Sequence, residues 1–145
     1  MSSVNSSIKN FSHSVGQNCY HLVLTPKMRY PLFSQKHQRD LADKAFEWVA
    51  GRHKIDIFAK EIMDDHVHLF VSCPPNCSVR KLAQLIKGGS SYYMRKYHPP
   101  LRQYRALWSK GFMYRSVGSV SAEVVQHYIE NSNDWFASKQ QKKLI

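Results

Sequence analysis

Two histidines, His66 and His68, stand two positions apart in a stretch whose side chains alternate in character. Branched apolar residues occupy the positions between and after them, so residues 62–73 are predicted to form a strand with one buried face. Residues two apart on a strand point to the same side, and both imidazoles therefore lie side by side. Neutral imidazole is a common metal ligand, so the pair forms half of a divalent-metal site. The simpler alternative is a pair of histidines on a solvated sheet face.

Other candidate residues surround this pair. Asp64 and Asp65 are expected to form a turn before the strand. Cys73 and Cys77 suggest a zinc site together with the histidines, but Cys73 has the opposite strand parity and points to the other face. Because three cysteines cannot all pair within one chain, free or buried thiols are the better expectation. Tyr128 follows Val124 by four residues in a predicted helix over 121–131, which fits packing as well as chemistry.

The charge of the chain favours a polyanionic partner. Lys and Arg outnumber Asp and Glu by 21 to 10, and not one acid occurs between His66 and Ala122. Tyr, Trp and Phe residues are interleaved with the cations there, as a site for single-stranded nucleic acid requires. The alternative is a solvated basic helix whose rings lie in the core. No apolar run approaches the roughly 20 residues of a membrane helix, and no signal peptide is evident, so a cytoplasmic protein without membrane contact is expected.

These residues must be positioned by the remaining elements. The patterns predict strands over 18–25, 54–63 and 108–117 beside the histidine strand, and helices over 35–52, over 79–97 and from Ser119 or Ser121. Ser34 and Ser78 are predicted helix caps, Gly51 a helix end, and Gly88-Gly89 an interruption of the second helix, caused by a kink or by close approach of another group. The order β-α-β-β-α-β-α indicates an α+β fold, a ferredoxin-like split βαβ sandwich with an antiparallel sheet and an additional C-terminal helix carrying Tyr128. The domain spans 18–137, between a flexible tail over 1–17 and a basic tail over 138–145.

Several motifs in order resemble a known family. Met63-Asp64-Asp65 before His66-Val67-His68, then Leu85-Ile86-Lys87-Gly88 with Ser90, Leu107-Trp108 and Tyr128-Ile129-Glu130-Asn131 are similar to the single-tyrosine HUH transposases of the IS200/IS605 type. The resemblance covers residues 19–131. It implies cleavage and rejoining of single-stranded DNA at hairpin-bearing insertion-sequence ends. Tyr128 would attack as the nucleophile, leaving a 5′-phosphotyrosine, and His66 and His68 would hold Mg2+ or Mn2+. It also implies a homodimer whose active sites are shared between subunits.

One position departs from that family. Its members carry Gln or a similar ligand four residues after the tyrosine, where this chain has Ser132 between Asn131 and Asn133. The third metal ligand is therefore open among these three. The residues expected to contact DNA are Lys27, Arg29, Arg80, Lys87, Gly88, Ser91, Arg95, Trp108 and Arg115.

Three other functions fit parts of the same sequence. A non-catalytic single-strand nucleic-acid-binding module of ferredoxin-like fold would use the basic surface without needing His66, His68 or Tyr128. A related housekeeping enzyme would process palindromes rather than element ends. A zinc hydrolase would use Cys73 and Cys77.

Overall fold

The structure is a computed structural model that describes residues 9–11, 14–118, 123, 126–127 and 130. Its main elements are four strands and two helices: β3 (Cys19–Leu24), α1 (Lys36–His53), β4 (Asp56–Ile62), β5 (Val67–Ser72), α2 (Val79–Tyr97) and β6 (Met113–Ser116). Two 3-10 turns, η2 (Lys27–Arg29) and η3 (Pro99–Gln103), lie in the connections.

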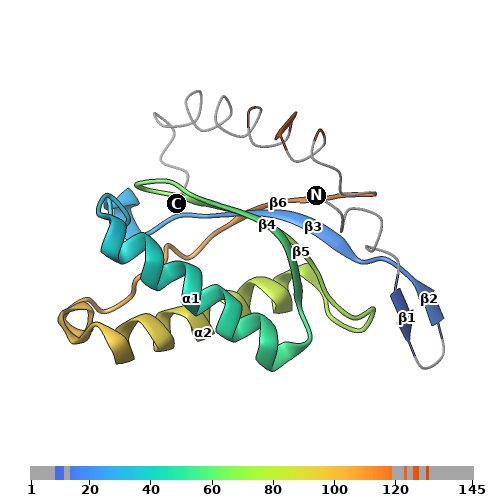
Figure 1. Ribbon diagram of the computed structural model, residues 1–145, viewed down its shortest axis with the longest axis horizontal. Helices are drawn as coiled ribbons and strands as arrows, with labels where there is room; N and C mark the ends of the chain where they lie inside the picture. The colour runs from blue at the N-terminus through green and yellow to red at the C-terminus, as the bar shows by residue number, and fades with distance from the viewer. Residues whose placement is uncertain (1–8, 12–13, 119–122, 124–125, 128–129, 131–145) are drawn as a thin grey trace.

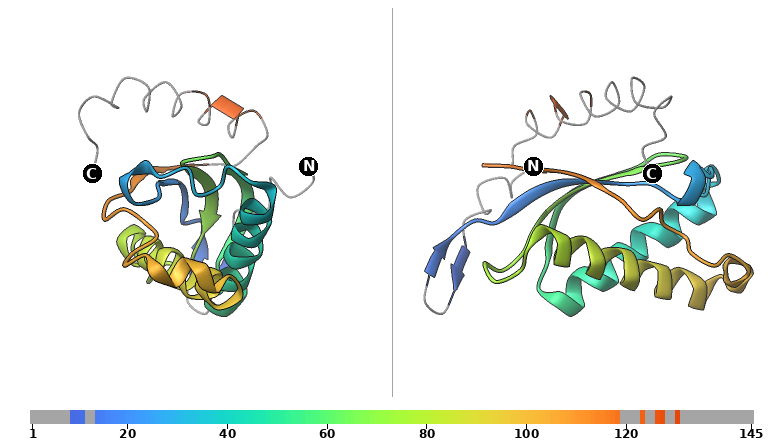
Figure 2. Two further views of the ribbon diagram at one scale, coloured as in Figure 1. Left: turned by 90° about the vertical axis from the view of Figure 1, so that its left-hand side faces the viewer. Right: turned by 180° about the vertical axis from the view of Figure 1, so that it is seen from behind.

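The four main strands form one sheet in the order β4-β5-β3-β6, and each neighbouring pair is antiparallel. Helices α1 and α2 lie side by side on one face of this sheet (Figure 1), and the views in Figure 2 agree. This is the split βαβ arrangement, with each helix connecting strands that are not neighbours. The predicted α+β, ferredoxin-like fold is confirmed.

The two faces of the sheet have different side chains. Leu22, Leu24 and Leu69 belong to the buried core cluster between sheet and helices. In the register, His21 pairs with Phe70 and Val23 pairs with His68, so these four side chains share the opposite face. The strand parity that separates Leu69 from His68 therefore also separates the core from the candidate site.

The second helix runs unbroken through Gly88 and Gly89, so the predicted interruption is wrong. A Cβ atom built at Gly89 would lie 2.5 Å from Cγ2 of Val49 in α1, whereas one at Gly88 would meet nothing within 4 Å. Gly89 thus lets α1 and α2 approach closely. The packing gained between the helices offsets the low helix propensity of glycine.

Helix ends agree with the sequence in one case of three. The side chain of Ser78 accepts a hydrogen bond from the Lys81 amide and caps α2, as predicted. Helix α1 begins after Gln35 rather than Ser34, with no side-chain cap. It also runs past Gly51 to His53 and closes at Lys54, whose left-handed backbone has φ 56°. The Lys54 and Ile55 amides both donate to the Ala50 carbonyl, which sets this end without a glycine.

Two further regions differ from expectation. Residues predicted to form an irregular tail contain a small hairpin of β1 (Lys9–Phe11) and β2 (Ser14–Gly16). The last strand, β6, begins at Met113 and is therefore shorter than predicted. Residues 109–112 form a connection instead, in which the carbonyls of Lys110 and Gly111 accept hydrogen bonds from the Lys87 ammonium. Tyr128, and most of the predicted third helix and the basic tail, lie outside the described residues. Among the described helices, none has the length and apolar character needed to cross a membrane.

Candidate active site

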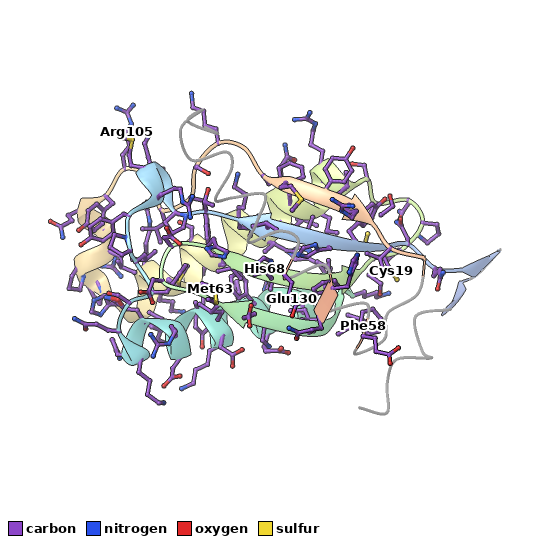
Figure 3. The ribbon with its side chains drawn as sticks, turned by 90° about the horizontal axis from the view of Figure 1, so that it is seen from above. Cys19, Phe58, Met63, His68, Arg105 and Glu130 are labelled. Carbon is purple, nitrogen blue, oxygen red and sulfur yellow. The ribbon has the colours of Figure 1, made fainter. Side chains whose placement is uncertain are left out.

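His66 and His68 lie together on the sheet face opposite the helices. His66 immediately precedes β5 and His68 lies within it, and their ring centroids are 5.0 Å apart with an interplanar angle of 82°. Both are buried, with exposed fractions of 8% and 0%. The shared face is as predicted, but the alternative of two solvated histidines is wrong. Figure 3, which looks at the molecule from above, shows His68 over the middle of the sheet.

The His66 ring is held by a carboxylate. Its Nδ1 lies 2.9 Å from Oδ1 of Asp65, and the Arg29 guanidinium donates to the other carboxylate oxygen of Asp65 at 2.8 Å. A carboxylate that accepts from Nδ1 fixes the tautomer in which Nε2 carries the lone pair. The Arg29–Asp65 ion pair therefore orients His66 with Nε2 as the nitrogen for a cation.

The His68 ring is held by a third histidine. Nε2 of His21, on β3, lies 3.1 Å from Nδ1 of His68, and His21 is also stacked on Phe70 at a centroid distance of 4.3 Å. Burial, with His68 and Arg115 nearby, lowers the pKa of His21 to about 3, so this ring is neutral near pH 7. A neutral ring can accept the Nδ1 hydrogen of His68, and in this tautomer Nε2 of His68 carries the lone pair that can ligate a cation.

Sequence reasoning missed His21. Its strand and its face follow from the alternation in residues 18–25, but its partner depends on which strand lies beside β3 and in which register. The alternation within one strand predicts neither the neighbouring strand nor the register.

The site fits a divalent cation as a two-histidine half-site. Two imidazoles oriented through Nδ1 are suitable nitrogen ligands for a transition-metal ion and can also hold Mg2+ with waters and phosphate oxygens. Within the described part of the chain, no three His, Cys, Asp or Glu side chains form a group that could hold a metal. The candidates for a third ligand, Asn131, Ser132 and Asn133, lie outside the described residues, as does Tyr128.

The cysteines do not join this site. Cys73 is buried in the core cluster on the helix side of the sheet, as its strand parity predicted. Burial and the neighbouring Cys77 raise the pKa of its thiol to about 12, which disfavours the thiolate that zinc requires. The three cysteines form no disulfide, and within the described part of the chain nothing supports a zinc hydrolase.

The residues predicted to contact DNA differ in their surroundings. Arg29 binds Asp65, the Lys87 ammonium donates to the carbonyls of Lys110 and Gly111, and Arg95 donates to the Tyr104 carbonyl. Burial lowers the pKa of Lys87. These three cations therefore also have structural roles.

The rest of that set divides between core and surface. Trp108 is buried and donates its indole hydrogen to Ser90 at 3.0 Å, so this ring has a packing role. Lys27, Arg80, Gly88 and Arg115 are exposed, and Ser91 is partly exposed. All nine contacts remain predictions.

Comparison with known proteins shows a consistent relationship. The family model described as "Transposase IS200 like" matches residues 14–132. The transposase for insertion sequence element IS200 of Salmonella typhimurium is 28% identical over 129 residues, covering 85% of this chain and 82% of that protein. The ISDra2 transposase TnpA of Deinococcus radiodurans is 26% identical over 118 residues, covering 79% of this chain and 84% of that protein.

Solved structures are similar in the same way. A crystal structure from Deinococcus radiodurans R1, assigned as a transposase, has a TM-score of 0.68 and 25% identity, and the match covers 85% of this chain and 96% of that one. A REP-associated tyrosine transposase bound to a REP hairpin has a TM-score of 0.57 at 10% identity, covering 94% of this chain and 75% of that one. The second likeness shows a shared fold.

Proposed function

Because this chain belongs to the IS200-like transposase family, we propose that it cleaves and rejoins single-stranded DNA that carries hairpins. The family implies a DNA-processing enzyme. The observation that carries the finer proposal is the pair His66 and His68, buried side by side with both Nδ1 atoms engaged by neighbouring side chains. A non-catalytic binding module has no need of two imidazoles oriented in this way.

In the proposed reaction, His66 and His68 would hold Mg2+ or Mn2+ through Nε2. When bound, the cation would supply positive charge beside the scissile phosphate, where negative charge builds up in the transition state. Asp65 and His21 keep both rings in the required orientation, so little reorganisation is needed when DNA binds.

Tyr128 is the proposed nucleophile. Its phenolic oxygen forms a bond to phosphorus, the bond from phosphorus to the 3′-oxygen breaks, and the phenolic proton passes to solvent while the 3′-oxygen takes up a proton. The product is a 5′-phosphotyrosine with a free 3′-hydroxyl, and a new 3′-hydroxyl reverses these steps to rejoin the strand. Because the phosphodiester energy is kept in the covalent bond, rejoining requires no ATP.

Charge and family membership support the proposed substrate class. The acid-free stretch between His66 and Ala122 provides cations for a phosphate backbone, and a structural neighbour is a tyrosine transposase bound to a REP hairpin. We infer a homodimer in which the Tyr128 helix of one subunit serves the histidines of the other.

The test uses the full chain with Mg2+ and a 3′-labelled, single-stranded hairpin oligonucleotide copied from the DNA that flanks its gene. Cleavage through Tyr128 transfers the label to the protein, and a denaturing gel then shows a labelled band at the protein's position. Tyr128→Phe keeps the ring and deletes only the attacking oxygen, so it should bind the hairpin and form no adduct. An adduct formed by Tyr128→Phe at the wild-type level would overturn the assignment of the nucleophile.

A mixing experiment tests the shared site. Tyr128→Phe and His66→Ala are each expected to be inactive, but their heterodimers contain one intact composite site. After subunit exchange has been verified, cleavage should return to a measurable fraction of the wild-type level. No recovery would indicate that each site is built within one chain.

A further inference from the structure

A pocket of about 370 Å³ opens between two segments that are far apart in the sequence, residues 26–32 and 103–107. Backbone contacts tie the two segments together: the Lys27 amide donates to the Leu107 carbonyl at 2.9 Å, and Pro26 forms a bridge with Trp108. Leu32 and Leu107 are buried and form the apolar base of the pocket. The pocket is thus held by the core and has a volume typical of small-molecule sites, about 300–1,000 Å³.

The rim of the pocket presents apolar and aromatic side chains to solvent. Tyr30 and Tyr104 are 53% and 39% exposed, with ring centroids 6.1 Å apart, and Met28 is 86% exposed. Large apolar side chains that are exposed together at a concave surface often mark a binding site, whereas single exposed apolar side chains are common on any protein surface. The two rings are tilted by 41° relative to each other, so a flat aromatic ligand can stack on one of them and contact the other at its edge.

The charges at this pocket favour an anionic ligand. Lys27 and Arg105 line it and are exposed, and no lining residue is acidic. A neutral peptide or an apolar metabolite would gain little from these cations. A nucleotide has both a flat base and a phosphate.

The wall of the pocket is linked to the candidate active site. Met28 and Arg29 adopt left-handed backbone conformations, with φ of 61° and 53°, although neither is glycine. The Arg29 side chain binds Asp65, and Asp65 binds His66. Conformations of this kind persist where surrounding contacts hold them, and they cluster at functional sites. A ligand in the pocket therefore lies against the same turn that positions a proposed metal ligand. Figure 3 shows Arg105 toward one end of the molecule, away from His68.

We propose that this pocket binds one unpaired base of the single-stranded DNA, with Tyr30 and Tyr104 contacting the base and with Lys27 and Arg105 contacting the adjoining phosphates. The inference rests on the proposed function and adds a base-binding position to it. The bound base holds the strand against the turn whose Arg29 binds Asp65, the partner of His66, and so contributes to placing the cleavage point.

An abasic scan combined with variants tests the pocket. Binding of the full chain to the hairpin oligonucleotide is measured by fluorescence anisotropy, with single bases removed in turn from the unpaired flanks. Removal of the pocket base should weaken wild-type binding by about tenfold, since stacking of one base on aromatic side chains has an effect of that order. Tyr104→Ala should weaken binding of intact DNA by a similar factor. This variant should bind the DNA that lacks the pocket base as well as it binds intact DNA.

Matched variants separate the pocket from general effects. Tyr104→Phe keeps the ring and should bind within about twofold of the wild type. Phe58→Ala removes a partly exposed aromatic ring on β4, outside the pocket and outside the acid-free stretch, and should also bind as the wild type does. Tyr30→Ala is the second pocket variant and should repeat the result of Tyr104→Ala.

The outcomes distinguish this inference from the function on which it rests. If the wild type forms the covalent adduct, but neither pocket variant changes DNA affinity, the pocket proposal is overturned and the proposed function stands. The pocket proposal is also overturned if Tyr104→Ala weakens binding by the same factor on intact DNA and on every abasic DNA, because the tyrosine and the removed base would then act independently at all positions. If the wild type neither binds the hairpin nor forms an adduct, the proposed function fails first, and the pocket proposal fails with it.

Discussion

Nε2 of His21 lies 3.1 Å from Nδ1 of His68, which joins two buried imidazoles from the neighbouring strands β3 and β5. His21 does not belong to the H-x-H pair, yet its contact favours the tautomer in which His68 would ligate the proposed cation through Nε2. With Asp65 on His66, each histidine of the pair has its own orienting partner.

His21→Ala is expected to weaken Mn2+ binding by about 10- to 100-fold, the usual effect of removing a group that orients a metal ligand. Isothermal titration calorimetry measures this directly and requires no DNA. His37→Ala, which removes an exposed histidine of α1, is the matched control and should leave the affinity unchanged. Equal Mn2+ affinity for His21→Ala and the wild type would contradict the orienting role.

His66→Ala and His68→Ala should each abolish cleavage in Mg2+ while hairpin binding stays within a few-fold of the wild type. The reason is that the phosphate and base contacts are expected outside the metal site. Adduct formation on denaturing gels and DNA affinity by anisotropy are measured on the same samples. A His66→Ala variant that cleaves near the wild-type rate would exclude a metal role for this residue.

DNA affinity should fall steeply as salt rises, because Lys and Arg that bind phosphates release condensed counterions. The expected slope of log affinity against log salt is about −0.7 for each phosphate contact on a single strand. Lys27→Ala and Arg115→Ala, which remove exposed cations, should each reduce the magnitude of this slope. A slope near zero in the wild type would show that the acid-free stretch between His66 and Ala122 is not the DNA surface.

Gly88 and Gly89 should respond to alanine in opposite directions. At Gly88 the new methyl group has open space, so Gly88→Ala should stabilise the protein by up to about 1 kcal/mol through helix propensity. At Gly89 the methyl group would meet Val49, and overpacking of about 1–3 kcal/mol should exceed that gain. Urea unfolding of the two variants measures the difference, and a Gly89→Ala protein more stable than the wild type would show that the helices can separate at no cost.

Stability should fall with pH below about 6.5 in the metal-free protein. The folded pKa of His21 is about 3 against an ordinary value of 6.5, so the unfolded chain binds a proton there that the folded chain does not. The contribution of His21 to stability is therefore fully present above pH 6.5 and is lost as pH falls toward 3, by up to about 1.4 kcal/mol per pH unit.

The matched variant for this measurement is His21→Gln, which cannot titrate. Urea unfolding in the presence of a chelator should show a shallower dependence between pH 6 and 4 for this variant than for the wild type. Parallel curves would mean that His21 is not the group that titrates.

The local features of the sequence determined much of the fold. Alternation in residues 62–73 gave both the strand and the face of His66 and His68, because side-chain direction on a strand depends only on parity. It also correctly placed Cys73 in the core. Ser78 marked the start of α2 because its side chain satisfies a backbone amide within the same turn. The order of the elements was sufficient to indicate the ferredoxin-like fold.

Features that depend on contacts between distant segments were decided by the tertiary structure alone. Gly89 is a packing position because Val49 of another helix lies against it, and no local pattern contains that distance. Lys87 and Arg29 appear in the sequence as cations for DNA, yet one binds the carbonyls of residues 110 and 111 and the other binds Asp65. His21 meets His68 only through the register of β3 and β5, and Tyr30 meets Tyr104 only because two loops are joined beneath them. The sequence determined which residue types were present and which way they face on each strand, whereas the pairing of strands and the packing of helices decided which of them touch.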